Sequence, residues 1–217
     1  MKDDDPKLSP AAGRRLSQYL RVLRGDRGAG TVSSESLAKS VGVSAAQVRR
    51  DLASLGHLGQ RGVGYDVTLL ADAIRHTLGI HREWRAVLIG VGNLARALLR
   101  YRGFAEQGFH IVGLFDADPA KIGTSLERLS IEPMENLVKR VQDLQAELAI
   151  LTIPSDAAAA IAETLATAGI RGILNFAPTL IRTPATTTIP IVSVDLAIQI
   201  EQLAFQVQAR SGARVVE

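Results

Sequence analysis

The residues best suited to chemistry form a glycine-rich stretch in the middle of the chain. Residues 86–89 have the apolar, β-branched composition of a buried parallel strand. Gly90, Gly92 and Ala95 follow with the spacing G-x-G-x-x-G/A, and residues 94–99 favour a helix. The two glycines permit a tight turn and close approach of a pyrophosphate, and the small third residue lets the helix pack on the strand. This pattern predicts a dinucleotide-binding loop, with a ligand-free glycine-rich turn as the alternative.

A carboxylate follows at the spacing of a ribose-binding acid. Residues 110–115 are predicted to form a second parallel strand, which ends at Asp116, 21 positions after Ala95. A carboxylate there accepts hydrogen bonds from the hydroxyls of an adenosine ribose, which favours NAD over NADP. A turn or capping role is the alternative for Asp116, and Asp118 is the second candidate for the ribose.

Strand and helix signals continue to alternate after this point. Residues 148–152 and 172–175 are predicted strands, and the alanine-rich residues 156–167 a helix. Such alternation predicts a doubly wound parallel sheet that binds ligands at the carboxyl ends of its strands. The loops at 152–154 and 175–178 are then walls of a nicotinamide pocket or simple turns. The candidate cofactor-binding residues are Gly90, Val91, Gly92, Asn93, Leu94, Ala95, Asp116, Asp118, Thr152, Ile153, Pro154, Asn175, Phe176, Ala177 and Pro178.

Charge is divided unevenly along the 217 residues. Residues 1–85 carry 14 Lys and Arg against 9 Asp and Glu, whereas residues 86–217 carry 11 against 13. The first part is therefore basic, with net charge +5, and the second is nearly neutral, with net charge −2. A basic segment indicates a polyanion partner, and the second segment is expected to bind a different ligand.

Composition narrows the function classes further. The chain contains no cysteine, which excludes disulfides and thiolate metal ligands, and we expect no metal site. Its acidic start lacks the order of a signal peptide, and no apolar run is long enough to span a bilayer. We therefore expect a soluble cytoplasmic protein without membrane association.

The N-terminal part carries the signals of three successive helices. Ser9 followed by Pro10 marks an N-cap and a first helical position. Either Ser33 or Ser34 can cap a second helix. A third helix begins at Ser44 after a tight turn. This order predicts a helix-turn-helix.

The third helix presents polar side chains that suit DNA. Ser44 and Gln47 have the spacing of a capping box. If the apolar residues face the core, the outward groups near the N-terminal half are Ser44, Gln47, Arg49 and Arg50, where a recognition helix contacts base edges. Arginine suits guanine O6 and N7, and glutamine suits adenine N6 and N7. A solvated basic helix face is the alternative.

A wing is predicted after this helix. Residues 57–67 contain recurring glycines followed by a short alternating strand, typical of a β-hairpin with Arg61 at its tip. A guanidinium there could enter a minor groove or pair with a phosphate. A winged helix-turn-helix fits residues 8–68, and its size indicates one DNA half-site per copy and hence a dimer.

The last predicted helix, residues 195–208, is apolar nearly all round. Gln199, Gln202 and Gln206 form a narrow polar stripe. Such a helix must bury more than one face, so we expect it to pack into a partner subunit, with burial in its own subunit as the alternative. The predicted domains are a winged-helix DNA-binding domain at 1–80, an NAD(H)-binding Rossmann domain at 81–192 and a dimerisation helix at 193–217.

Motifs along nearly the whole chain resemble one known family, the redox-sensing transcriptional repressor Rex. They are SSESLAKSVGVSAAQVRRDL, QRGVGYDV, GVGNLARAL, FDADP, GILNFAP and VDLA, in that order. The resemblance implies a homodimer with winged helices, an NAD(H)-binding domain and a C-terminal helix exchanged between subunits. It also implies repression at operator double-stranded DNA, release by NADH, and competition by NAD⁺ without release. The expected fold class is α/β: a winged helix-turn-helix, a doubly wound Rossmann-like sheet and a C-terminal domain-swapped helix.

The resemblance also implies switch residues and shows departures. Arg21, Tyr101 and Asp195 match positions at which the family exchanges an Arg–Asp pair for a Tyr contact when the nucleotide state changes. The family usually has Gly where Ala95 stands and Lys where Arg50 stands. It also has aromatic residues near the positions of Leu55 and Leu58.

Three hypotheses follow from the sequence. The first is an NADH-responsive repressor without catalysis. The second is a small NAD-dependent oxidoreductase with an appended DNA-binding domain. Against it, the stretch after residue 178 is not long enough for a substrate domain, and the histidines form no motif with a carboxylate as a hydride-transfer acid/base requires. The third is a DNA-binding or scaffold protein that binds no nucleotide. The histidines are His57, His76, His81 and His110.

Overall fold

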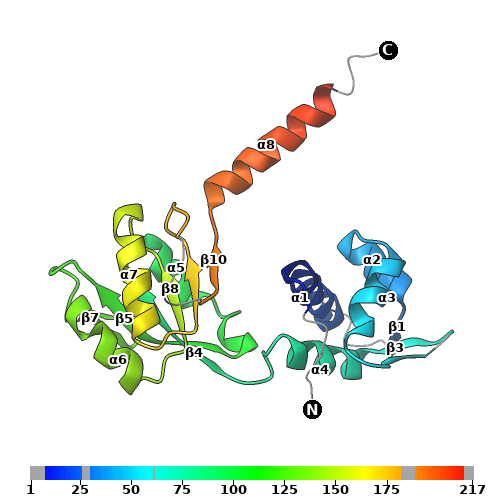
Figure 1. Ribbon diagram of the computed structural model, residues 1–217, viewed down its shortest axis with the longest axis horizontal. Helices are drawn as coiled ribbons and strands as arrows, with labels where there is room; N and C mark the ends of the chain where they lie inside the picture. The colour runs from blue at the N-terminus through cyan, green and yellow to red at the C-terminus, as the bar shows by residue number, and fades with distance from the viewer. Residues whose placement is uncertain (1–7, 26–29, 61, 182–188, 213–217) are drawn as a thin grey trace. The chain divides into compact units, whose positions relative to one another are not determined.

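The computed structural model describes residues 8–25, 30–60, 62–181 and 189–212 (Figure 1). The chain divides into two compact units, Met1–Arg82 and Glu83–Glu217. Each unit has its own buried core.

The first unit is built on helices that begin where the serine caps predict. The side-chain oxygens of Ser9, Ser33 and Ser44 accept hydrogen bonds from N–H groups of Ala12, Ser36 and Gln47 at 3.1–3.2 Å. This confirms the predicted starts and selects Ser33 over Ser34 as the second cap. The helices are α1 (Pro10–Gly25), α2 (Ser34–Val41), α3 (Ala45–Ala53) and α4 (Val67–Thr77).

A small antiparallel sheet completes this unit. The strands are β1 (Thr31–Val32), β2 (Gly59–Gln60) and β3 (Gly64–Asp66), in the order β1-β3-β2. The β2–β3 hairpin confirms the predicted wing, whereas β1 was not predicted because two residues carry no periodicity. Leu16 of α1, Val48 of α3 and Leu70 of α4 are fully buried together. α3 therefore packs on a core that it shares with α1 and α4.

The second unit is a doubly wound sheet, as predicted. Its strands lie in the order β10-β9-β8-β4-β5-β7-β6, all parallel to their neighbours except β6. The chain starts at β4, adds β5 and β7 on one side, and then crosses to β8, β9 and β10 on the other. The order therefore reverses between β4 and β8, the position at which such sheets bind ligands. The strands are β4 (Trp84–Ile89), β5 (Phe109–Asp116), β6 (Ser125–Leu126), β7 (Leu129–Pro133), β8 (Leu148–Leu151), β9 (Gly172–Asn175) and β10 (Ile191–Ser193).

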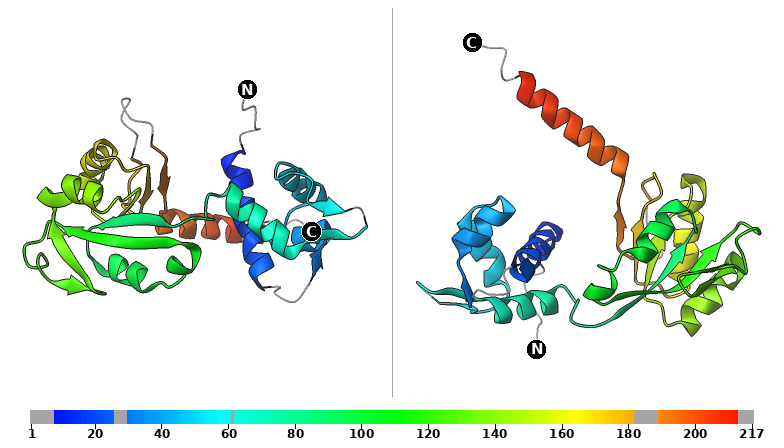
Figure 2. Two further views of the ribbon diagram at one scale, coloured as in Figure 1. Left: turned by 90° about the horizontal axis from the view of Figure 1, so that it is seen from below. Right: turned by 180° about the vertical axis from the view of Figure 1, so that it is seen from behind.

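Helices cover both faces of this sheet (Figure 2). Val87 and Ile89 of β4 pack in one cluster with Leu137 of α6. Leu88, between them, packs on the other face with Ala95 of α5. This alternation follows from the two-residue period of a strand, because both faces are covered and neither is polar. The helices are α5 (Asn93–Arg100), η1 (Ala105–Gln107), η2 (Met134–Asn136), α6 (Leu137–Asp143), α7 (Ser155–Thr167) and α8 (Leu196–Gly212).

Helix α8 is apolar but not buried. Every side chain at positions 196–210 is exposed, and Phe205 reaches 73% exposure. The alternative of burial within its own subunit is therefore wrong for these residues. Within the described part of the chain, no helix is long and apolar enough to cross a membrane.

Candidate functional site

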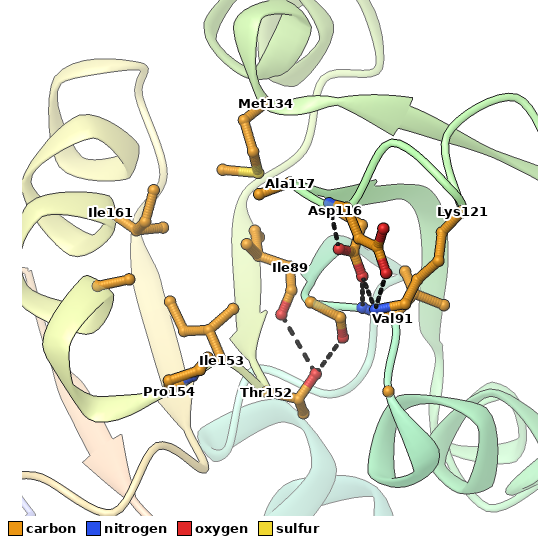
Figure 3. Close-up of a pocket in the computed structure, with 14 residues that line it drawn as sticks. Ile89, Val91, Asp116, Ala117, Lys121, Met134, Thr152, Ile153, Pro154 and Ile161 are labelled. Atoms are coloured by element: carbon orange, nitrogen blue, oxygen red, sulfur yellow. Dashed lines mark hydrogen bonds and ion pairs between the residues drawn. The ribbon is translucent and has the colours of Figure 1, made fainter.

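A pocket of about 580 Å³ lies at the carboxyl ends of β4, β5 and β8, where the strand order reverses. In Figure 3, Asp116, Lys121 and Val91 lie on one side of the pocket, and the apolar side chains Ile153 and Ile161 lie on the other. Such a division suits a nucleoside, because a base needs apolar walls and a ribose needs polar groups. The predicted residues that line it are Gly90, Val91, Gly92, Asp116, Asp118, Thr152, Ile153 and Pro154.

Gly90 has no room for a side chain. Its φ is +86°, and a Cβ atom there would stand 2.6 Å from Ile153 Cγ2 and 2.7 Å from the carbonyl oxygen of Thr152. The Thr152 hydroxyl also donates a hydrogen bond to the Gly90 carbonyl. Gly90 therefore makes the turn and also lets the β4 and β8 loops touch.

Gly92, in contrast, has room for a side chain. Its φ of −95° suits any residue, and a Cβ atom there would meet no atom within 4 Å. Gly92 caps α5 without a side-chain hydrogen bond, so the backbone at the helix start faces open space. A phosphate group has access to the helix N–H groups at this point. Ala95, one turn on, is fully buried as predicted.

Asp116 holds the glycine loop against the end of β5. Its Oδ2 accepts the N–H of Val91 at 2.7 Å, and its Oδ1 accepts the N–H of Asp118 at 2.9 Å. The Lys121 ammonium lies 3.0 Å from Asp116 Oδ2 and 3.6 Å from Asp118 Oδ2. Asp116 thus performs the turn-stabilising role that was the alternative, and its ribose contact stays a prediction.

The carboxyl of Asp116 stays ionised in this setting. Burial alone would raise its pKa, but hydrogen bonds from the N–H groups of Asp118 and Val91 and from Lys121 outweigh that effect, so the pKa lies below its usual 3.8. Sequence reasoning missed Lys121. Its position five residues after Asp116 is the only signal that could have found it.

Other predicted cofactor residues do not line this pocket. Asn93, Leu94 and Ala95 form the first turn of α5. Asn175 is fully buried, and its amide is satisfied locally: Oδ1 accepts the N–H of Ala177 at 2.9 Å, and Nδ2 donates to the carbonyl of Thr179 at 3.0 Å. Asn175 therefore shapes its loop and does not present its side chain as a wall.

A second hollow of about 370 Å³ contains two of the three remaining predicted positions. Ala177 and Pro178 line it together with Ser193, Asp195 and Ile198. Phe176 is not among the lining residues and packs instead against the apolar cluster on the α5 face. The loop after β9 thus meets the start of α8 at a cavity.

The predicted DNA-facing residues lie on α3, with Arg61 outside the described residues. Ser44 is the exposed N-cap. Arg49 Nη1 donates to Ser34 Oγ at 2.9 Å and to Glu35 Oε1 at 3.0 Å. Arg50, also exposed, donates to the side-chain oxygen of Gln47 at 3.3 Å.

The capping box is only half formed, which corrects the sequence analysis. Ser44 accepts from Gln47 N–H, but the Gln47 side chain does not return to Ser44. Instead, Gln47 Nε2 donates to Asp51 Oδ1 at 2.8 Å. The buried carboxylate of Asp51, one turn away, therefore holds the amide that a complete capping box would turn back to Ser44.

That carboxylate is the centre of a network that sequence reasoning missed. Asp51 is 4% exposed and accepts from Arg15 Nε at 2.6 Å and Nη2 at 2.7 Å, and from the Tyr19 hydroxyl at 2.9 Å. Burial alone would raise the pKa of Asp51, but the bonds from Arg15, Gln47 and Tyr19 lower it below 3.8. Burial and the bond to Asp51 raise the pKa of Tyr19 to about 12. The network joins α1 to α3.

The residues implied as a switch lie in different surroundings. Arg21 is exposed on α1 of the first unit. Tyr101 follows α5 and stacks edge-on against Phe104, with ring centroids 5.2 Å apart. Asp195 caps α8 by accepting the N–H of Ala197 at 2.9 Å.

The histidines need one correction. His110 Nε2 lies 3.6 Å from Glu83 Oε1, so one histidine does pair with a carboxylate. His110 stands near the amino end of β5, whereas Asp116 and the pocket are at its carboxyl end. The pair is therefore remote from the glycine loop. The described residues contain no cluster of three or more His, Asp or Glu that could hold a metal ion.

A winged helix-turn-helix followed by a doubly wound sheet with a glycine-loop pocket is the architecture of a ligand-responsive DNA-binding protein. Family models agree with this class. Residues 7–53 match the putative DNA-binding protein N-terminus, and residues 81–179 match the CoA binding domain.

Relatives give the particular family. The chain is 47% identical to the redox-sensing transcriptional repressor Rex of Rhodopirellula baltica, covering 96% of this chain and 88% of that one. It is 43% identical to Rex of Carboxydothermus hydrogenoformans, covering 93% and 97%, and 39% identical to Rex 1 of Thermotoga maritima, covering 98% and 100%. The chain therefore belongs to the Rex family of redox-sensing transcriptional repressors.

Solved structures of a Rex-family repressor, RSP, have the same fold. The RSP complex with β-NAD⁺ and operator DNA matches with a TM-score of 0.88 at 29% identity, covering 96% of this chain and 99% of that one. The RSP complex with β-NADH matches with a TM-score of 0.85 at 28% identity, covering 97% and 99%.

Proposed function

We propose that this chain is an NADH-responsive transcriptional repressor. It binds operator double-stranded DNA as a homodimer and is released when NADH binds, so that it senses the ratio of NADH to NAD⁺. The observation that carries the proposal is the glycine-loop pocket at the point of strand reversal, in a chain that also has a winged helix-turn-helix. The RSP complexes with β-NAD⁺ and operator DNA and with β-NADH support both ligands.

The residues of the pocket fit a dinucleotide. The open face at Gly92 and the first N–H groups of α5 would hold the pyrophosphate. Asp116 and Asp118 would accept the adenosine ribose hydroxyls, and their charge disfavours the extra phosphate of NADP(H). Ile153 and Ile161 would pack on the adenine, which replaces the nicotinamide wall that the sequence indicates for residues 152–154. The nicotinamide ring supplies the signal when bound, because it is cationic in NAD⁺ and neutral in NADH.

The polar groups of α3 would face the DNA, and Arg61 in the wing would contact a groove or phosphate. Asp51 of α3 is bonded to two side chains of α1, so one hydrogen-bond network joins the two helices. Arg21, which the family resemblance implies as a switch residue, also lies on α1, so a change of partner at Arg21 would reach α3 through this network. This supports a mechanical link between nucleotide state and DNA affinity.

Dimerisation through α8 completes the proposal. Leu196, Ile200, Leu203 and Phe205 are each more than 60% exposed, although water solvates such surfaces poorly. A second copy of the chain would cover them. We place the protein in the cytoplasm, where operator DNA and NADH meet.

Catalysis is not part of the proposed role. The relatives are named as transcriptional repressors, and the histidine–carboxylate pair lies near the other end of β5. Steady consumption of NADH in the presence of small carbonyl substrates would contradict this part of the proposal.

A mobility-shift experiment tests the function. A duplex selected by the protein from a randomised library serves as operator, with a scrambled duplex as control. We expect a specific protein–DNA complex that dissociates when NADH is added and persists when NAD⁺ is added. Persistence of the complex at saturating NADH would overturn the sensing role, and absence of any selected duplex would overturn the DNA-binding role.

A further inference from the structure

The Asp51 network continues outward to the DNA-facing surface of α3. Asp51 is ionised and nearly inaccessible to water, so its oxygens require hydrogen-bond donors from the protein. Arg15 supplies two donors at 2.6 and 2.7 Å and Tyr19 a third at 2.9 Å. Gln47 Nε2 supplies the fourth, at 2.8 Å to Oδ1. Gln47 is the member of this network closest to the helix start.

The carboxylate fixes which way the Gln47 amide points. Only the NH₂ group of an amide can donate to Asp51. Turning the amide over would bring Gln47 Oε1 against Asp51 Oδ1, which loses a hydrogen bond and opposes two acceptors. The amide oxygen of Gln47 is therefore directed away from Asp51, and it accepts Arg50 Nη1 at 3.3 Å. Both polar ends of Gln47 are engaged by neighbouring side chains.

We propose that Gln47 is a positioning residue that transmits the fixed position of Asp51 to Arg50, and that Arg50 is the residue that contacts a base. This inference rests on the proposed function and replaces the direct adenine contact that the sequence indicates for Gln47. The neighbouring arginine, Arg49, is held by other partners and donates hydrogen bonds to Ser34 and Glu35 of α2. The two arginines therefore have separate supports.

The arrangement lowers the cost of ordering Arg50. A free arginine side chain loses rotamer freedom when it bonds a base, at a cost of roughly 0.5–1.5 kcal/mol for an immobilised side chain. A carbonyl that already accepts from one guanidinium nitrogen restricts those rotamers before DNA arrives. The remaining donors of the guanidinium stay available for guanine O6 and N7.

A double-mutant cycle tests the inference with full-length protein and the selected duplex. Gln47→Met keeps the length of the side chain but removes both hydrogen bonds, and Arg50→Ala removes the proposed base contact. We expect Arg50→Ala to weaken binding about fivefold or more and Gln47→Met about threefold. The double variant should bind within about twofold of Arg50→Ala alone, since Gln47 acts only through Arg50.

Base preference provides a readout that a structural role would not change. Each variant is titrated against duplexes substituted at every position of the half-site. Gln47→Met should relax the preference at the same base pair as Arg50→Ala, and Arg49→Ala should leave that base pair unaffected. Thermal unfolding of each variant serves as the control for folding.

Several results would overturn the inference. If the losses of affinity in the two single variants multiply in the double variant, Gln47 contacts DNA itself. The same conclusion would follow if a 7-deazaadenine substitution in the duplex weakened binding of the wild type but not of Gln47→Met. An unchanged base preference in either single variant would show that Gln47 does not act through Arg50. If the wild type selects no duplex, the proposed function fails as well, whereas the other results leave it intact.

Discussion

Replacing Gly90 by alanine perturbs the dinucleotide loop at its tightest point. An alanine at φ +86° costs about 1–2 kcal/mol in backbone strain. Its methyl group would stand 2.7 Å from the Thr152 carbonyl oxygen, and because that atom is backbone, the loop itself must move, at about 1–3 kcal/mol. We expect a loss of roughly 2–5 kcal/mol in the free energy of unfolding. The thermal midpoint should fall by about 5 °C or more.

The matched control is Gly92→Ala. Its φ of −95° is ordinary, and the methyl group would meet no atom within 4 Å, so the midpoint without ligand should stay unchanged. The same methyl group lies where the pyrophosphate is expected, so NADH affinity should fall about tenfold or more. Scanning calorimetry and titration calorimetry with NADH measure the two effects. A normal midpoint for Gly90→Ala, or normal NADH affinity for Gly92→Ala, would refute the reasoning.

Three further predictions follow from other parts of the molecule. Asp116 has a lowered pKa, so its contribution to stability is complete above its usual 3.8 and declines as the pH falls below that value. The difference in unfolding free energy between wild type and Asp116→Asn should therefore narrow at the acid end of a series from pH 7 to 3, and a constant difference would contradict this. Arg49→Ala should weaken operator binding about fivefold or more and leave NADH affinity unchanged. Reduced NADH affinity in this variant would disprove the assignment of DNA binding to the first unit and NADH binding to the second. Phe205→Glu should raise the dimer dissociation constant about 100-fold or more in analytical ultracentrifugation, because it places a charge on the apolar face of α8. Gln202→Glu, which adds the same charge on the polar stripe, is the control, and equal effects of the two variants would argue against a dimer through the apolar face.

The parts of the fold that the sequence predicts correctly are governed by local physics. The glycine loop follows from spacing, because only small residues fit a tight turn and a close helix–strand contact. β9 (Gly172–Asn175) matches its predicted range, since short apolar runs between turns identify buried strands. Serine caps identify helix starts for the same local reason. β1 and β6 have two residues each, which is too short for any periodic signal.

The side-chain networks could not be predicted, because they join residues that are distant in sequence. Asp51 bonds Arg15 and Tyr19, which are 36 and 32 positions away. Its carboxylate also determined that Gln47 would complete only half of a capping box. Asn175 illustrates a different limit, because its partners are close in sequence. Its position at a strand end indicates a pocket wall, but its buried amide forms hydrogen bonds with its own loop.

The proposed function requires that NADH and operator DNA each weaken the binding of the other to the protein. Binding linkage requires this opposition to be reciprocal, because each ligand must change the affinity of the other by the same factor. The most direct measurement is the dissociation constant of NADH without and with saturating operator duplex. We predict that operator weakens NADH binding by the factor by which NADH weakens operator binding. Equal NADH affinities in the two conditions would contradict the account.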